Sequence, residues 1–204
     1  MKIEPGTLTG RLIQLVPLQR NDAGELFAAG SDPRIWAFMR YGIVDSLEKM
    51  QAFIEDQLAH QAWGTDLPFT VIEKASGKKI GMTRYLNVEP DNRALEIGGT
   101  WYALAHQRTG VNTEAKFLLL EHAFETIGVI RVQFKADVRN AVSQRALERI
   151  GCVKEGLLRD HMILPDGTVR SSYYYSILAR EWPAVKASLQ EKISRTYPEP
   201  VYKT

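Results

Sequence analysis

The stretch of the sequence best suited to chemistry is Gln107–Thr113, which reads Q-R-T-G-V-N-T. It is polar, holds one glycine and leads without a proline into apolar residues at helical spacing, such as Phe117 and Leu120. The first N–H groups of a helix have no acceptor within it, and the helix dipole adds positive potential at that end. We therefore expect an anion-binding site at this helix start. The alternative is structural: Gly110 and Thr113 would turn the chain and cap a core helix, with Thr113 as N-cap.

The helix after this loop is predicted to be amphipathic and to run to Ile127. Its apolar residues are expected to face the core: Phe117, Leu120, Phe124 and Ile127. Its charged residues are expected to face elsewhere: Glu114, Lys116, Glu121 and Glu125. A strand is predicted before the loop, over residues 93–102, which read R-A-L-E-I-G-G-T-W-Y. The paired glycines Gly98 and Gly99 predict a β-bulge in it, or a close approach of another group to its backbone.

Length and composition indicate an ordinary soluble protein. The 204 residues suit a single domain over 1–204, with a core over about 8–182 and a C-terminal helix and tail over 183–204. The net charge of +2 and the lack of a run of Lys and Arg predict no nucleic-acid partner. No window resembles a signal peptide or a membrane span, so we expect a cytoplasmic protein with no membrane partner.

Cysteine and histidine usage argues against a metal site. The single cysteine, Cys152, excludes an internal disulfide, and its position after a helical pattern favours a small buried apolar role. The four histidines are scattered and show no ligand spacing. No metal is expected.

The remaining elements follow from periodicity and turn signals. Helices are predicted after Asn21–Asp22, from Asp45 or Ser46 to about Ala62, from Asn140 to Ile150, and over residues 181–193. Strands are predicted over residues 11–17 at a sheet edge, 69–73, 80–88, 130–137, 153–164 and 170–178; residues 196–204 are expected to be a loose tail. The strands over 69–73, 80–88 and 93–102 are expected to be antiparallel neighbours, and the strand over 130–137 to lie parallel after a right-handed crossover.

Residues 34–44 (R-I-W-A-F-M-R-Y-G-I-V) are dense in aromatics and have no clear period. Such a segment either lines a pocket or packs against the core. The candidates for lining an acceptor pocket are Trp36, Met39, Arg40 and Tyr41.

This order of elements resembles the GCN5-related N-acetyltransferase (GNAT) superfamily, and specifically its RimJ/RimL type. Three motifs carry the resemblance: E-I-G-G-T-W before the loop, Q-R-T-G-V-N-T-E-A at the helix start, and N-A-V-S-Q-R-A-L-E-R-I-G-C-V-K-E-G further on. It implies an α/β (α+β) fold: a mixed, mostly antiparallel twisted sheet of about seven strands flanked by helices, with a parallel strand pair splayed at the cofactor site. Compared with the family's loop pattern, Gln107 and Gly110 match, whereas Arg108 and Asn112 depart from it, and Cys152 replaces a frequent phenylalanine.

The resemblance also implies acetyl-CoA as cofactor, with its pyrophosphate on the loop N–H groups and its pantetheine beside the end of the preceding strand. The implied cofactor-binding residues are Trp101, Tyr102, Ala103, Leu104, Gln107, Arg108, Thr109, Gly110, Val111, Asn112, Thr113, Asn140 and Ser143. A backbone N–H near Tyr102 would polarise the thioester.

Two residues are implied in catalysis. Ser143 stands where RimL-like enzymes have a serine and would protonate the leaving thiolate; a structural role for it is the alternative. Glu96 is the candidate base, acting through a water, and its structural alternative is a partner for an arginine on a neighbouring strand. The position used for the base in RimL-like enzymes falls near Met162, whose nearest ionisable neighbours are Asp160 and His161.

The leading function is therefore acetyl-CoA-dependent transfer of an acetyl group to a primary amine, either a protein N-terminus or a small-molecule amine. The alternative is a CoA-binding sensor or partner module of the same fold that has lost catalysis. The resemblance also implies a homodimer.

Overall fold

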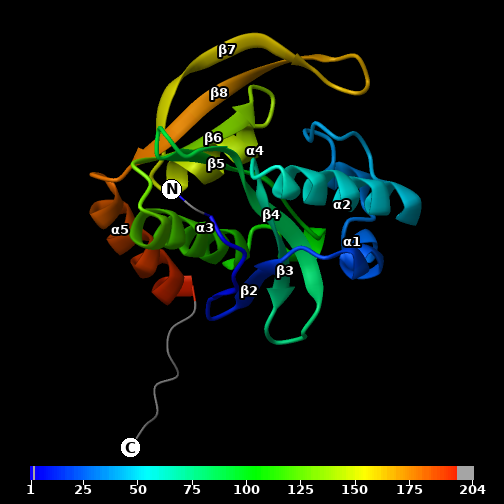
Figure 1. The fold of residues 1–204 in the computed structure, drawn as a ribbon, viewed down its shortest axis with the longest axis horizontal. Coiled ribbons are helices and arrows are strands. Elements are labelled where there is room, and N and C mark those ends of the chain that lie inside the picture. The colour runs from blue at the N-terminus through cyan, green and yellow to red at the C-terminus, as the bar shows by residue number, and fades with distance from the viewer. Residues whose placement is uncertain (2, 197–204) are drawn as a thin grey trace, which may run out of the picture.

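The computed structural model describes residues 1 and 3–196 and has the predicted order of elements with one additional strand at its start (Figure 1). The strands are β1 Leu8–Thr9, β2 Ile13–Pro17, β3 Leu67–Glu73, β4 Lys79–Glu89, β5 Ala94–Tyr102, β6 Arg131–Asp137, β7 Val153–Ile163 and β8 Val169–Leu178. The helices are α1 Ala23–Ala29, α2 Leu47–Ala62, α3 Val111–Glu121, α4 Ala141–Arg149 and α5 Trp182–Thr196. A π-helical turn, His122–Ile127, extends α3. The tail was predicted over residues 196–204, but Thr196 ends α5, and residues 197–204 lie outside the described residues.

Local signals in the sequence set several helix boundaries. The Ser46 hydroxyl accepts a hydrogen bond from the Lys49 N–H (3.2 Å) and starts α2. Asn140 starts α4 in the same way. The segment extending α3 ends at Gly128 (φ +77°), and α4 is followed by Gly151 (φ +97°); both glycines adopt the left-handed conformation that they tolerate best.

The eight strands form one sheet in the order β1-β2-β3-β4-β5-β6-β8-β7. Every neighbouring pair is antiparallel except β5 and β6, which are parallel and joined through α3, as the crossover rule predicts. The prediction of about seven strands missed β1, whose two residues pair with β2 at Leu8↔Leu15. The expectation that residues 11–17 form an edge strand was therefore wrong, because β1 lies outside β2.

Helices cover both faces of the sheet. One core cluster joins the sheet to α3, α4 and α5, and includes Leu119, Leu147 and Leu189. A second cluster joins α1 and α2 to Met82 and Trp101 of the sheet. Figure 1 shows α3 and α5 beside one another and α1 and α2 as a separate group, with the β7–β8 hairpin running across the top of the view. This arrangement leaves the end of β5 between two helical layers.

Candidate active site

The sheet opens between its two parallel strands. β5 and β6 pair only at Ala94↔Arg131, Leu95↔Val132 and Glu96↔Gln133. Beyond these residues β5 continues to Tyr102 and β6 to Asp137, yet no further pairing joins them. The splayed parallel pair predicted for this fold is confirmed. An opening at the carboxyl ends of parallel strands exposes backbone groups to which an extended ligand can bind.

A β-bulge lies in β5 beside this opening. The register passes from Met82↔Trp101 to Arg84↔Gly98, so three steps along β5 oppose two along β4. Gly99 has φ +58°, and a Cβ there would lie 2.9 Å from Nε of Arg84. The bulge predicted from the paired glycines is confirmed, and it leaves Gly99 and Thr100 without a register partner on either neighbouring strand.

The end of β5 is tied to the loop and to α3. The Tyr102 hydroxyl donates to Oδ1 of Asn112 (3.3 Å), and Nε2 of Gln107 donates to the Tyr102 carbonyl (3.1 Å). Burial raises the pKa of Tyr102, which therefore stays a neutral donor. The Trp101 ring lies 5.1 Å from that of Trp36, so it joins the cluster under α1 and α2. Gln107 and Asn112 thus hold the loop against the strand beside the opening.

The loop itself is a 3₁₀ turn followed by an exposed tip. Ala103 and Leu104, both half-buried, lead into the turn Leu104–His106. Arg108 is exposed and has φ +60°, a conformation unusual for a residue with a side chain. The Thr109 hydroxyl donates to the His106 carbonyl (2.7 Å) and accepts from the Val111 N–H (3.3 Å).

The start of α3 differs from the capping expectation. Gly110 is the N-cap and makes no side-chain capping hydrogen bond, and Val111 is the first residue of the helix. The alternative in which Thr113 is the N-cap was wrong, because Thr113 is buried and its Oγ1 accepts from Nη2 of Arg149 (2.8 Å). Arg149, from the last turn of α4, brings a cation to this helix start. No feature of the sequence pointed to that contact.

Two charged residues of α3 are buried, contrary to the amphipathic prediction. The Glu114 carboxylate accepts from the backbone N–H groups of Arg11 (2.7 Å), Leu12 (2.8 Å) and Ile13 (3.0 Å), just before and at the start of β2. Lys116 is 5% exposed, and its Nζ donates to Oγ1 of Thr100 (2.6 Å) in the bulge. The helix is covered on more sides than its apolar periodicity indicated.

The first turn of α4 holds Asn140 and Ser143, both half-buried. Oδ1 of Asn140 accepts from the Ser143 N–H (2.9 Å), as the predicted N-cap requires. The helix follows directly from β6, the strand on the other side of the opening. Asn140 and Ser143 therefore belong to the segment that leaves the far strand of the opening.

Glu96 is the last β5 residue paired with β6, and it is 4% exposed. Its Oε2 accepts from Nδ2 of Asn87 (2.9 Å) and Nε2 of Gln133 (3.2 Å), and lies 2.9 Å from Nζ of Lys135. Its charged partner is thus a lysine of β6, whereas the structural alternative named an arginine. Burial is the largest single influence on the pKa of Lys135 and lowers it, but the charge and hydrogen bond of Glu96, together with Tyr174, outweigh burial and raise the pKa. Three donors on one oxygen hold this carboxylate at the point where the strands part.

Comparison with known proteins agrees with this geometry. The family described as "Acetyltransferase (GNAT) domain" matches residues 12–153. The chain belongs to the GNAT acetyltransferase family.

Four relatives illustrate the range of the family around this chain. YdaF of Bacillus subtilis is 37% identical over 110 residues, which are 54% of this chain and 59% of YdaF. The ribosomal-protein-serine acetyltransferase of Escherichia coli is 29% identical over 99 residues, which are 48% of this chain and 55% of that protein. A crystal structure of a GCN5-related N-acetyltransferase from Brucella melitensis has a TM-score of 0.89 and 30% identity, covering 95% of this chain and 87% of that one. Mycobacterium smegmatis RimJ, solved in complex with CoA-disulfide, shares the fold with a TM-score of 0.77 and 22% identity, covering 92% of this chain and 93% of that one.

The segment between α1 and α2 in this GNAT domain is anchored through a buried ion pair that sequence reasoning missed. Arg84 of β4, 2% exposed, pairs with Asp66 (2.8 Å) and also donates to the hydroxyl of Tyr41 and to Gln57. The guanidinium of Arg40 lies 5.0 Å from the centre of the Tyr41 ring. Tyr41 is therefore held against the strand that faces the bulge.

The other residues predicted to line the acceptor pocket differ in their solvent accessibility. Trp36 is 2% exposed, and its Nε1 donates to the Gly30 carbonyl (2.8 Å), so its ring is part of the core. Met39 is half-buried against the same cluster. Nη1 of Arg170, from β8, donates to the Phe38 carbonyl (3.2 Å) and ties this segment to the far strands.

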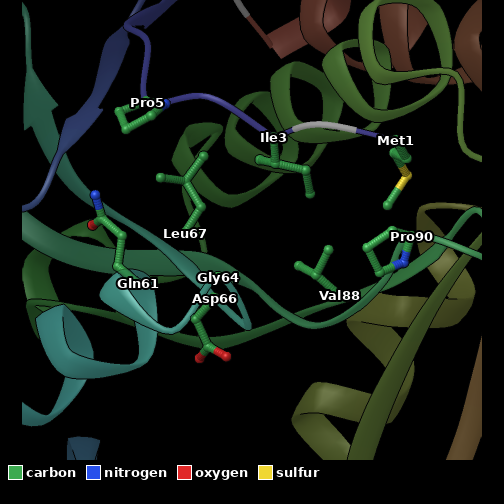
Figure 2. Close-up of a pocket in the computed structure, with 9 residues that line it drawn as sticks. All are labelled: Met1, Ile3, Pro5, Gln61, Gly64, Asp66, Leu67, Val88 and Pro90. Atoms are coloured by element: carbon green, nitrogen blue, oxygen red, sulfur yellow. The ribbon is translucent and has the colours of Figure 1, made fainter.

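Two cavities of the GNAT domain lie away from the cofactor loop. The larger, about 300 Å³, is enclosed by Met1, Ile3 and Pro5 on one side and the segment after α2 with β3 and β4 on the other (Figure 2). The smaller, about 250 Å³, is lined by polar and apolar residues that include Asn87 and Gln133, both donors to Glu96. The smaller cavity therefore reaches two of the donors that fix the candidate catalytic carboxylate.

The described residues hold no group of three His, Cys, Asp or Glu side chains arranged to bind a metal ion. Within the same part of the chain, every helix is too short or too polar to cross a bilayer.

Proposed function

We propose that this protein transfers the acetyl group of acetyl-CoA to a primary amine, either a protein N-terminus or a small-molecule amine. The observation that carries the proposal is the opening between β5 and β6, flanked by the bulge at Gly99 and by the start of α3, where Gly110 is the N-cap. An extended pantetheine can bind the free edge of β5, and a diphosphate suits the N-terminus of α3.

The cofactor would lie across the residues that the resemblance named. Its pyrophosphate would contact the backbone at Arg108–Thr113, with the side chains of Arg108 and Arg149 adding positive charge. Its pantetheine would follow Trp101–Leu104, with the Asn140 amide on the opposite side of the opening. Bound acetyl-CoA supplies an acetyl group activated as a thioester.

Side chains of the protein would accept the proton from the amine and donate one to the thiolate. A C–N bond forms as the C–S bond breaks, so the amine loses a proton and the thiolate gains one. Glu96 would accept the amine proton through a water, because its Oε2 is fixed by three donors while its Oε1 remains to accept. Ser143, on α4, would donate to the thiolate sulfur.

The acceptor would enter from the side of the α1–α2 segment, where Met39, Arg40 and Tyr41 lie. The E. coli relative's name specifies a ribosomal-protein serine, which makes a peptide with an N-terminal serine the first acceptor to test. A small amine such as spermidine represents the other class. Assembly as a homodimer stays a prediction.

The test combines binding with turnover. Isothermal titration calorimetry should show acetyl-CoA binding, and a thiol-release assay should show CoA formation with either the serine peptide or spermidine. A Gly110→Val variant, whose side chain would crowd the phosphate site, should lose binding, whereas Gly24→Ala should not, because a Cβ at Gly24 meets nothing within 4 Å. Failure of the parent protein to bind acetyl-CoA would refute the proposal. Binding without turnover across a wide amine panel would instead favour the CoA-sensor alternative.

A further inference from the structure

Lys116 is a buried lysine that has no acidic partner among the residues that the structure describes. It is 5% exposed, and no carboxylate among the described residues forms an ion pair with its Nζ. Burial lowers the pKa of Lys116 to about 7. A buried ammonium without a counter-charge is costly, and a methionine of similar length would fill the same space at lower cost. This lysine therefore needs an explanation beyond packing.

The contacts of Lys116 lead to the bulge. Its Nζ donates to Oγ1 of Thr100 (2.6 Å), and Thr100 shares a second hydrogen bond with the hydroxyl of Thr83 on β4 (2.8 Å). Thr100 follows Gly99 and, like it, has no register partner on β4 or β6. The chain of contacts from α3 through Thr100 to β4 thus fixes the unpaired part of β5, at the opening of the sheet.

A second neighbour makes the site of Lys116 apolar and closed. Cys152, at the start of β7, is buried, and burial raises the pKa of its thiol. A neutral thiol leaves the charge of Lys116 unbalanced. In a site with little water, such a charge acts strongly on groups nearby.

We propose that Lys116 is a positioning residue for acetyl transfer, acting through Thr100. It holds the bulge in place and, in its protonated form, puts a positive charge behind the backbone that faces the acetyl carbonyl, where negative charge develops during attack by the amine. A fixed charge aimed at such a site stabilises the transition state more than the ground state. This inference rests on the proposed function and adds to it a residue of α3.

The test compares Lys116→Met, Lys116→Arg and Thr100→Val with the parent, and uses Lys49→Met as a matched control on the exposed face of α2. Calorimetry gives the Kd for acetyl-CoA, and isotope-edited infrared spectroscopy of bound [1-¹³C]acetyl-CoA gives the thioester carbonyl stretch. The infrared measurement reports carbonyl polarisation without any acceptor. Turnover is then measured with the acceptor that the parent accepts, and both measurements are made at about pH 6, where most of Lys116 is protonated.

We expect Lys116→Met to move the carbonyl band toward its value in free acetyl-CoA and to lower kcat by about tenfold or more, with little change in Kd. Thr100→Val should have the same two effects. Lys116→Arg keeps the charge and a donor, so its carbonyl band and kcat should lie between those of Lys116→Met and the parent. If circular dichroism shows that Lys116→Met does not fold, the Thr100→Val variant provides the test of the inference.

A carbonyl band and kcat equal to the parent's in a folded Lys116→Met or Thr100→Val protein that binds acetyl-CoA would overturn the inference and leave the proposed function intact. Absence of acetyl-CoA binding to the parent would instead remove both.

Discussion

Substituting Gly99 by alanine tests whether the bulge in β5 creates the cofactor site. Gly99 has φ +58°, and an added Cβ would lie 2.9 Å from Nε of Arg84. Gly64 offers a matched control, because it has φ +77° but a Cβ there meets nothing within 4 Å. Both variants pay the conformational cost of a side chain in the left-handed region, about 1 kcal/mol. Only Gly99→Ala must also displace Arg84.

The additional loss of stability in Gly99→Ala follows from the contacts that fix Arg84. Its guanidinium is buried and paired with Asp66 at 2.8 Å, so it cannot turn into solvent to make room. Disturbing a buried ion pair costs up to about 3–5 kcal/mol when one partner is lost, and a displacement should cost part of that. We expect Gly64→Ala to lose about 1 kcal/mol of unfolding free energy and Gly99→Ala about 3 kcal/mol.

Urea denaturation measures the stability difference, and calorimetry with acetyl-CoA measures its consequence for the site. Because the bulge shapes the edge along which the pantetheine would lie, Gly99→Ala should weaken acetyl-CoA binding by about tenfold or more, a loss of about 1.4 kcal/mol. Gly64→Ala should bind like the parent. Equal stability and equal binding of the two variants would refute the reasoning about the bulge.

Four other predictions test single groups. Glu96→Gln should lower kcat by about 100-fold without weakening acetyl-CoA binding, and an unchanged kcat would remove Glu96 as the base. Asn140→Asp keeps the oxygen that caps α4 but loses the amide donor, so calorimetry should show weaker acetyl-CoA binding at nearly unchanged stability; equal affinity would argue against a pantetheine contact. Ser143→Ala should lower turnover with little change in binding, and parental turnover would exclude the serine. Because burial lowers the folded-state pKa of Lys116 to about 7 from 10.5, the unfolded state binds the extra proton between these values. The unfolding free energy of the parent relative to Lys116→Met should therefore rise with pH from 7 to 10, and a flat difference in urea titrations would contradict the burial of this lysine.

Much of the fold was determined by local sequence signals. Ser46 and Asn140 start their helices, Gly151 follows the end of α4, and Gly98–Gly99 mark the bulge, because each depends on the conformational preferences of one or two residues. The two-residue strand β1 was missed, since so short a segment has no periodicity and exists only through its pairing with β2.

In the candidate site, too, some features could be predicted from the sequence and others were fixed only by the tertiary structure. The sequence by itself determined the polar loop before α3, the glutamate at the end of the parallel pairing, and the residues of the first turn of α4. Tertiary structure alone decided that Glu114 supports the start of β2, that Lys135 is the partner of Glu96, and that Lys116 is buried against Thr100. Helical periodicity reports one buried face, but α3 is enclosed by strands and helices distant in sequence. Those neighbours fix which charges are buried and which groups compensate them.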